Sequence, residues 1–332
     1  MTSSVLKFAL INFLIKQTRQ TQIILPTEIE IRPRRIYLRH DPIKIEIKDT
    51  ISQKNMKKID IHVHIGKMLF KLPGLKIPYV LKWMDELEIE KACVMAIENP
   101  EELDYYVTTE QVLRSCRQHP ERLIPFCNVD PRRGNPTEFD PYPIIARYQK
   151  RGARGFGEML AGLRIDDPRQ QKIYKACEML ALPVLMHIDK YRNRDEIGLS
   201  RLEKMLTAFP DLTFIAHANH WWSEISTGVQ EEDRFGYPDG PIKPGGRVEQ
   251  LLQKYDNLYA DLSANSGLNA ITRDPMFTPG FLTRNQNKLL FGSDLVCKNQ
   301  KITTHEALDA TGVATQVLQK IYYKNSERIL NL

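Results

Sequence analysis

Long apolar runs are missing from this 332-residue sequence. None approaches the roughly 18 residues that a helix needs to cross a bilayer, so we expect no membrane-spanning segment and no membrane partner. The best candidate, FALINFLI at residues 8–15, has the character of a signal-peptide core. It is short, however, and basic residues rather than a small-residue cleavage site follow it. We therefore expect a cytoplasmic protein, with secretion as the alternative.

Cysteine is scarce, and its spacing does not suggest pairing. The count is odd, the residues are far apart and no C-x-x-C pair occurs, which favours reduced thiols over a disulfide framework. Three of them lie in apolar runs and are expected to be small core residues. The five are Cys93, Cys116, Cys127, Cys177 and Cys297.

An excess of one charge sign is missing from most of the chain. Residues 1–57 hold 11 of the 47 basic and 5 of the 41 acidic side chains, which leaves 36 of each sign for residues 58–332. The main part of the protein therefore offers no electrostatic reason to bind nucleic acid. The basic excess at the N-terminus is interpreted as a solvated face.

The sequence also lacks an internal repeat and a G-x-G-x-x-G motif after its first strand, which removes the main support for a dinucleotide-binding fold. What it has is a regular alternation of short β-like runs with helical patterns. Eight strands over about 270 residues predict a (β/α)₈ TIM barrel at residues 58–332, although a doubly wound sheet gives the same alternation. The expected strands are 58–63, 91–97, 122–129, 153–158, 183–188, 212–217, 257–263 and 288–294.

Residues 1–57 do not follow this alternation of strand and helix patterns. Segments 28–33, 35–40 and 43–49 alternate apolar and charged residues, and His40-Asp41-Pro42 is a plausible turn. We expect a small β-rich N-terminal extension, a hairpin or small sheet, laid against the barrel.

Two histidines raise the question of function. His62 and His64 lie one residue apart in KIDIHVHIG, so on a strand both side chains point to the same face. Two buried imidazoles need partners, and a divalent metal would accept a lone pair from each. The pair alone is a weak signal.

Four more candidate ligands stand at the ends of predicted strands. They are Glu158, His187, His217 and Asp294. Because the carboxyl ends of barrel strands share one mouth, all six side chains should converge there. Imidazole and carboxylate together suit zinc and similar ions, so we expect one or two divalent cations, with Zn²⁺ preferred.

This set resembles the amidohydrolase superfamily, in its amidohydrolase-related branch. The resemblance covers roughly residues 58–332 and implies a metal-dependent TIM-barrel enzyme. It implies that His62, His64, His187, His217 and Asp294 bind metal, with Asp294 as the proton acceptor and His217 as an electrophile or proton relay. The fourth-strand position varies in that superfamily. Here Glu158 could bridge two ions, bind one or act as an acid/base group.

The resemblance leaves the reaction open. A hydrolase would use a metal-activated water on an ester, lactone or amide of a small molecule. A non-oxidative decarboxylase of aromatic or unsaturated carboxylic acids is the first alternative, and a barrel that binds metal or ligand without turnover is the second. Glu158 favours hydrolysis. The oligomeric state is also open, with a homo-oligomer as one alternative.

Substrate contacts are expected from the loops. The 221–246 stretch is long for a compact domain and predicts a lid. We expect Trp221 or Trp222 to face the metal, with anchoring of the loop by one of them as the alternative. His220, Lys190 with its neighbours Tyr191 and Arg192, and Asn265 are further candidates, each with exposure to solvent as the alternative.

Overall fold

The computed structural model describes residues 29–32, 35–38, 56–67, 72–102, 106–135 and 137–332, and the chain separates into two compact units, 1–51 and 52–332. In the first unit, β1 (Ile29–Arg32) pairs antiparallel with β2 (Arg35–Leu38), as the alternating segments predicted. The predicted strand at 43–49, the turn at 40–42 and the apolar stretch at 8–15 lie outside the described residues. The extent of this extension and its packing against the barrel stay predictions.

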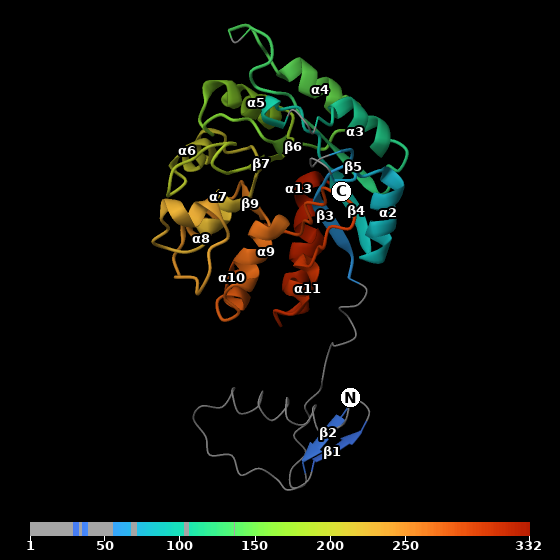
Figure 1. The fold of residues 1–332 in the computed structure, drawn as a ribbon, viewed down its shortest axis with the longest axis vertical. Coiled ribbons are helices and arrows are strands. Elements are labelled where there is room, and N and C mark those ends of the chain that lie inside the picture. The colour runs from blue at the N-terminus through green and yellow to red at the C-terminus, as the bar shows by residue number, and fades with distance from the viewer. Residues whose placement is uncertain (1–28, 33–34, 39–55, 68–71, 103–105, 136) are drawn as a thin grey trace. The chain divides into compact units, whose positions relative to one another are not determined.

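The second unit is a nearly closed (β/α)₈ barrel (Figure 1). Its strands are parallel and follow chain order around the sheet, each near a predicted segment. They are β3 (Lys58–Val63), β4 (Ile89–Val94), β5 (Leu123–Cys127), β6 (Gly155–Met159), β7 (Val184–His187), β8 (Phe214–His217), β9 (Leu258–Asp261) and β10 (Leu289–Leu290). The TIM-barrel prediction is confirmed.

Helices cover the outside of the strands. Several begin at signals readable in the sequence: α5 starts at Pro168, and the Asp167 side chain accepts a hydrogen bond from the Arg169 amide. The principal helices are α2 (Ile77–Glu86), α3 (Thr109–Cys116), α4 (Tyr142–Lys150), α5 (Pro168–Met179), α6 (Ser200–Ala208), α8 (Arg247–Lys254), α9 (Ala264–Thr272) and α10 (Thr278–Arg284).

Shorter helical elements lie in the loops and at the C-terminus. These are η2 (Pro100–Glu102), α7 (Asn219–Ser223), η3 (Glu231–Phe235), α11 (Thr304–Asp309), α12 (Thr315–Gln319), η4 (Lys320–Lys324) and α13 (Asn325–Leu330). No helix in the described part of the chain has both the length and the apolar character to cross a bilayer.

The apolar core has two layers. A large cluster lies between strands and helices, and a smaller one contains Ile61, Phe126, Leu185 and Ile215, which come from four different strands. Because side chains alternate along a strand, the smaller cluster fills the space that the strands enclose. All five cysteines are free thiols. Cys93, Cys127 and Cys177 are buried, as predicted; Cys116 is buried as well, and Cys297 is partly exposed.

The barrel closes between its first and last strands with few contacts. No regular ladder joins β3 and β10. Instead, the Ile61 amide donates to Phe291 O and the Asp294 amide donates to His62 O, at 3.0 and 2.8 Å. An isolated bridge between Val63 and Leu295 continues the seam beyond β10. The seam thus lies next to the residues predicted to bind metal.

Two glycines let β6 pack closely against its neighbours. A Cβ on Gly155 would collide with the Phe126 ring, and one on Gly157 would lie 2.8 Å from Leu185 O. Gly157 also has φ +147°, which a side chain rarely tolerates. The absence of side chains at both positions therefore permits a close backbone approach, and β6 carries Glu158 to the barrel mouth.

Substituting Gly155→Ala should destabilise the barrel by about 1–3 kcal/mol, because the added methyl group overpacks the site beside Phe126. The free energy of unfolding from urea titration measures the effect. Gly236→Ala is the control, because its Cβ would meet nothing within 4 Å, and it should change stability by less than about 0.5 kcal/mol. Equal stabilities for the two variants would contradict this account of the packing.

Candidate metal centre

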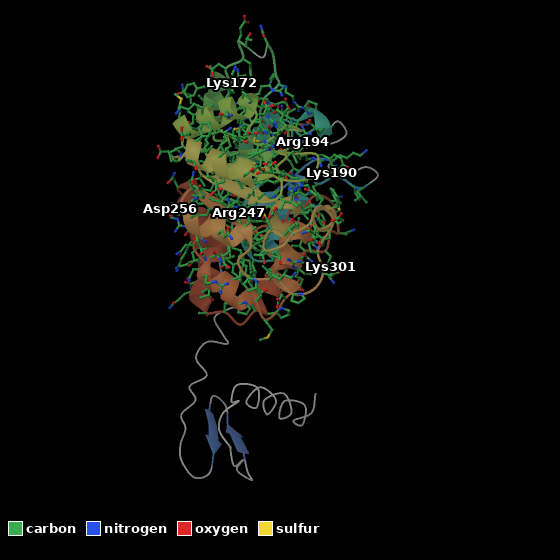
Figure 2. The ribbon with its side chains drawn as sticks, turned by 90° about the vertical axis from the view of Figure 1, so that its left-hand side faces the viewer. Lys172, Lys190, Arg194, Arg247, Asp256 and Lys301 are labelled. Atoms are coloured by element: carbon green, nitrogen blue, oxygen red, sulfur yellow. The ribbon has the colours of Figure 1, made fainter. Side chains whose placement is uncertain are left out.

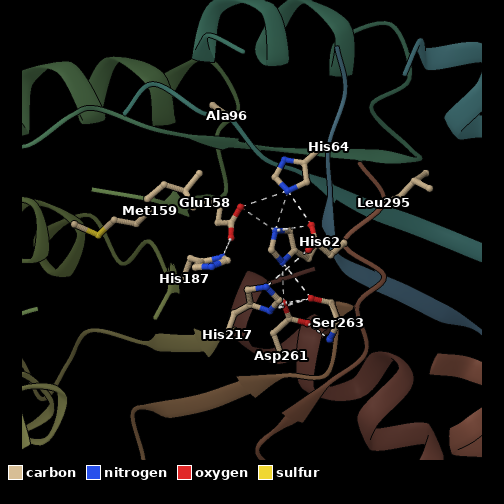
Figure 3. Close-up of polar contacts among 12 residues, drawn as sticks. His62, His64, Ala96, Glu158, Met159, His187, His217, Asp261, Ser263 and Leu295 are labelled. Atoms are coloured by element: carbon tan, nitrogen blue, oxygen red, sulfur yellow. Dashed lines mark hydrogen bonds and ion pairs between the residues drawn. The ribbon is translucent and has the colours of Figure 1, made fainter. Parts of the chain in front are cut away.

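Four histidines and two carboxylates from different strands converge at the carboxyl end of the barrel, as the sequence predicted (Figure 3). The His62 ring centroid lies 4.9 Å from that of His64 and 4.7 Å from that of His217. The His187 and His217 rings are 5.3 Å apart. Neither His187 nor His217 lies in the helical layer.

His62 and His64 aim their Nε2 atoms at one point, 3.0 Å apart. The register between β3 and β4 shifts between Asp60 and Val63, an irregularity of the kind that re-aims side chains near functional sites. Asp294 Oδ1 lies 3.2 Å from His64 Nε2, and Glu158 Oε2 lies 3.4 Å from the Nε2 atoms of both histidines.

These residues fall into two overlapping groups that could each hold an ion. One is His62, His64 and Asp294, and the other is His62, Glu158 and His217; within each, the potential ligand atoms lie within 4.8 Å of one another. Five of the six predicted ligands are thereby brought together with ligand spacing. Their role as ligands stays a prediction.

Asp261, at the end of β9, fixes the orientation of two of the rings. Its Oδ2 lies 2.8 Å from His62 Nδ1 and 3.1 Å from His217 Nδ1. A carboxylate at this position accepts both Nδ1 protons, which leaves the Nε2 lone pairs free to face the centre. This carboxylate–histidine arrangement is typical of metal sites, so the residues present fit a divalent cation.

Ser263 completes the support below the rings. Its hydroxyl donates to Asp261 Oδ2 at 2.6 Å and lies 3.2 Å from His62 Nδ1 and 3.1 Å from His217 Nδ1. Asp261 and Ser263 are fully buried. The ring orientations are thus held by a dry polar cluster.

The carboxylates and imidazoles of the centre shift one another's pKa values. Burial raises the pKa of Glu158, but the facing imidazoles of His62, His187 and His64 outweigh it and hold that pKa well below its usual range. Burial lowers the pKa of His62, but Glu158 and Asp294 outweigh it and the pKa rises well above its ordinary value. The carboxylates therefore favour any positive charge placed among them.

His187 lies between two carboxylates. Its Nδ1 lies 2.8 Å from Glu158 Oε1 and its Nε2 lies 3.1 Å from Asp189 Oδ2. Both ring nitrogens are thus engaged by carboxylates, and His187 joins neither ligand group. It lies beside Glu158 at the mouth, with its side chain 23% exposed, and its role as a ligand stays a prediction.

Sequence reasoning did not single out Asp261, Asp189 or Ser263. Asp261 ends the strand predicted at 257–263, so the strand-end rule that selected Asp294 could have selected it. Asp189 and Ser263 each lie two residues beyond a strand-end residue of the centre, and no pattern distinguishes them from ordinary loop residues.

Three residues of the mouth adopt left-handed backbone conformations. Ala218, Ala264 and Asp294 have φ values of +83°, +58° and +53°. Each follows a barrel strand by a few residues, beside a residue of the polar cluster. Such conformations cost energy and persist where surrounding contacts determine them, as they often do at functional sites.

The tryptophans of the 221–246 loop are packing residues. Trp221 and Trp222 are 0% and 2% exposed, and Trp222 Nε1 donates to Asp261 O at 3.0 Å. Neither ring has a face open to a substrate. This corrects the prediction that one of them faces the metal and stacks on substrate; both anchor the start of the loop.

Another part of this loop does border the mouth. A cavity of about 370 Å³ is lined by Tyr237 of the loop, by Asp294, by Asn265 and by Lys301 among others. The predicted substrate residue Asn265 is therefore exposed next to a predicted ligand. Asp294 connects the cavity to the histidine cluster.

The remaining substrate candidates lie on the β7 and β8 loops. Lys190 is exposed, with its Nζ 4.6 Å from the centre of the Phe235 ring. His220 is buried, and neither of its ring nitrogens has a hydrogen-bond partner within the described part of the chain. Their contact with substrate stays a prediction.

Comparison with known proteins gives a family and a fold. The sequence profile of the amidohydrolase family matches residues 59–332. Curated protein sequences give no match. Among solved structures, an uncharacterised TIM-barrel protein from Bordetella bronchiseptica superimposes with a TM-score of 0.58 at 16% identity, covering 83% of this chain and 99% of that one.

Two further structures bear names of enzymes. A probable 2-pyrone-4,6-dicarboxylic acid hydrolase from Acinetobacter baumannii has a TM-score of 0.58 at 14% identity, covering 83% of this chain and 100% of its own. A dihydroxybenzoic acid decarboxylase from Polaromonas, with bound manganese and an inhibitor, has a TM-score of 0.53 at 14% identity, covering 83% and 97%. At these identities, the likeness establishes the fold alone.

Substituting Asp261→Asn should weaken Zn²⁺ binding by about 10- to 100-fold. Oδ2 accepts from both Nδ1 atoms and Oδ1 accepts from the Ser263 amide, so an amide NH₂ group at either position would face a donor. Competition with a chromophoric chelator measures the dissociation constant. Asp256→Asn is the matched control, since that aspartate is exposed at the other end of β9. Unchanged affinity in the Asp261 variant would contradict its orienting role.

Proposed function

Because this chain belongs to the amidohydrolase family, whose profile matches residues 59–332, we propose that it is a metal-dependent hydrolase of a small-molecule ester, lactone or amide. The observation that carries the proposal is the pair of ligand groups sharing His62. His62 and His217 direct their Nδ1 atoms at Asp261, and the buried Nε2 atoms of His62 and His64 lie 3.0 Å apart. Such a set is costly to bury unless a cation lies within it.

A divalent ion, when bound, supplies Lewis acidity and makes water acidic enough to ionise near neutral pH. His62, His64, His217, Glu158 and Asp294 are the residues that would hold it. Zn²⁺ is our first expectation from the donor set, and Mn²⁺ is a second because a structural neighbour contains it. The two overlapping ligand groups are compatible with one bound ion or with two.

Asp294 is the proposed proton acceptor. Its side chain is 20% exposed, whereas those of His62 and His64 are 0% and 1% exposed, so it is the part of the set that a molecule in the cavity reaches. Burial raises its pKa, but His62 and His64 outweigh that effect and the pKa is lowered. Asp294 is therefore ionised at neutral pH and able to take a proton from water and return it to a leaving group.

His217 is proposed to polarise the substrate or relay a proton. Its Nδ1 is fixed by Asp261 and Ser263, and its Nε2 lies 3.9 Å from Asp294 Oδ2. That distance allows one proton to pass between the two residues with a small adjustment or through one water.

Decarboxylation is the second candidate. It is favoured by the structural likeness to a dihydroxybenzoic acid decarboxylase, which has the same fold. Glu158 is the feature that favours hydrolysis here, because a buried acidic group on β6 suits a second ion or a hydrolytic site. The two reactions differ in product, since only decarboxylation releases CO₂.

The double substitution His62→Ala, His64→Ala should remove bound metal and lower activity by about 1,000-fold or more, since the ion contributes several kcal/mol to the transition state. Elemental analysis and turnover on a panel of lactones, esters, amides and aromatic carboxylic acids measure both. His119→Ala, at the opposite end of β5, is the control.

The outcomes separate the candidates. Acid release from lactones, esters or amides supports the hydrolase, and CO₂ release from aromatic acids supports the decarboxylase. Metal uptake without turnover on any of these compounds favours a non-catalytic barrel. Full activity in the metal-free double variant would refute the mechanism.

The cavity beside Asp294 predicts a preference for anionic substrates. Lys301 supplies the positive charge among its lining residues, and Lys190 and Lys301 lie on the same side of the barrel (Figure 2). Lys301→Met should raise KM for an anionic substrate about tenfold, the low end for losing a charged hydrogen bond, with kcat nearly unchanged. Lys298→Met, in the same loop but outside the cavity lining, is the control. An equal effect on neutral substrates would contradict charge recognition.

A further inference from the structure

Asp60 is a fully buried carboxylate that the proposed chemistry does not use. It lies on β3, two residues before His62. A single oxygen, Oδ1, accepts hydrogen bonds from the backbone amides of His62 and Ser293, both at 3.0 Å. Oδ2 has no partner among the described residues. One oxygen thus links the first strand to the segment after the last strand.

Both amides belong to ligand-bearing backbone. His62 is itself a predicted ligand, and Ser293 directly precedes Asp294. Two more hydrogen bonds join the same segments. The Asp294 amide donates to His62 O at 2.8 Å, and the Ser293 hydroxyl donates to His62 O at 3.3 Å. These bonds set how far the β3 histidines lie from Asp294.

Asp294 needs such support. Its backbone is left-handed, with φ +53°, a conformation that an aspartate keeps only where its surroundings determine it. In this conformation, Oδ1 lies 3.2 Å from His64 Nε2. The Ser293 amide, fixed by Asp60, belongs to the Gly292–Ser293 peptide group, one residue before the left-handed Asp294.

Two side chains join the backbones at this seam: Asp60 accepts from two amides, and the Ser293 hydroxyl donates to His62 O. Gly292, just before Ser293, packs so closely that an added Cβ would collide with Asp261 Oδ1 and lie 3.2 Å from Ile61 Cγ2. With little room for water, the loss of Asp60 would leave two buried amides without an acceptor. The backbone would have to shift to regain partners.

We propose that Asp60 is a positioning residue that clamps the His62 and Asp294 backbones at the spacing required for joint metal binding. The proposal rests on the metal centre described above. A purely structural role for Asp60, closing the barrel without influence on the ligands, is the alternative. If a folded Asp60 variant has altered ligand geometry, the positioning role is supported; if the geometry is unchanged, the role is purely structural.

Reconstitution with Co²⁺ tests the clamp, because the visible absorption of this ion reports ligand geometry independently of turnover. Asp60→Ala should weaken Co²⁺ binding about tenfold or more, the range for residues that orient ligands, and should shift the visible bands. Asp60→Asn can keep the oxygen acceptor and should recover most of the affinity and the wild-type spectrum. Asp60→Glu moves the oxygen by one methylene group and should shift the bands even if Asp60→Ala does not fold.

Asn325→Ala is the matched control for stability. Asn325 is equally buried, and its amide donates to Leu289 O and Gln286 O at the opposite end of β10. It should lower the unfolding midpoint and leave the Co²⁺ spectrum unchanged. The clamp is overturned if Asp60→Ala and Asp60→Glu retain wild-type spectrum and affinity, or if Asn325→Ala alters them equally. Wild-type protein that takes up no Co²⁺ would instead overturn the metal centre, and the clamp with it.

Discussion

The candidate centre depends on the hydrogen bonds that the buried Asp261 carboxylate accepts. A charge removed from water needs several hydrogen bonds, and Asp261 receives them from two imidazoles and the Ser263 hydroxyl. These hydrogen bonds orient the His62 and His217 rings, whose Nε2 atoms lie 3.7 and 3.9 Å from the Asp294 carboxylate oxygens. Glu158 and Asp294 then face the same small volume, and three carboxylates so close together require compensating positive charge. Protons supply it through the raised pKa of His62, so a divalent cation would enter by displacing protons.

Much of this arrangement could be predicted from the sequence, because both the order of strands and the convergence of their end residues follow from simple periodic patterns. Alternating strand and helix patterns predicted eight strands near their observed places, and the rule that strand ends meet at one mouth predicted which side chains converge. The largest error in a strand boundary is at the last one, where residues 288–294 were expected and only Leu289–Leu290 form a ladder. Beyond Leu290 the chain bonds to β3 through the Asp60 side chain and single backbone contacts, which no periodicity encodes.

The remaining features depend on tertiary contacts. Two adjacent tryptophans in a loop have the composition of a binding surface, yet packing buries both and uses one to hold the Asp261 backbone. Alanine is no marker of a left-handed backbone, so the conformations of Ala218 and Ala264 had no signal in the sequence. His187 occupied its expected strand end, but the carboxylate of Asp189, two residues later, decided which partners its ring has.

The seam between β3 and β10 also determines when the centre can come into existence. Asp60 and Ser293 are 233 residues apart in the chain, so the contact that joins them closes one of the longest loops in the protein. During synthesis, the β3 histidines emerge first and Asp294 emerges long after them. A chain that lacks the last strand therefore carries the imidazole pair without its opposing carboxylate. The donor set proposed to hold an ion can thus assemble only when the ring of strands has closed, and the finished geometry would then determine which cation is bound.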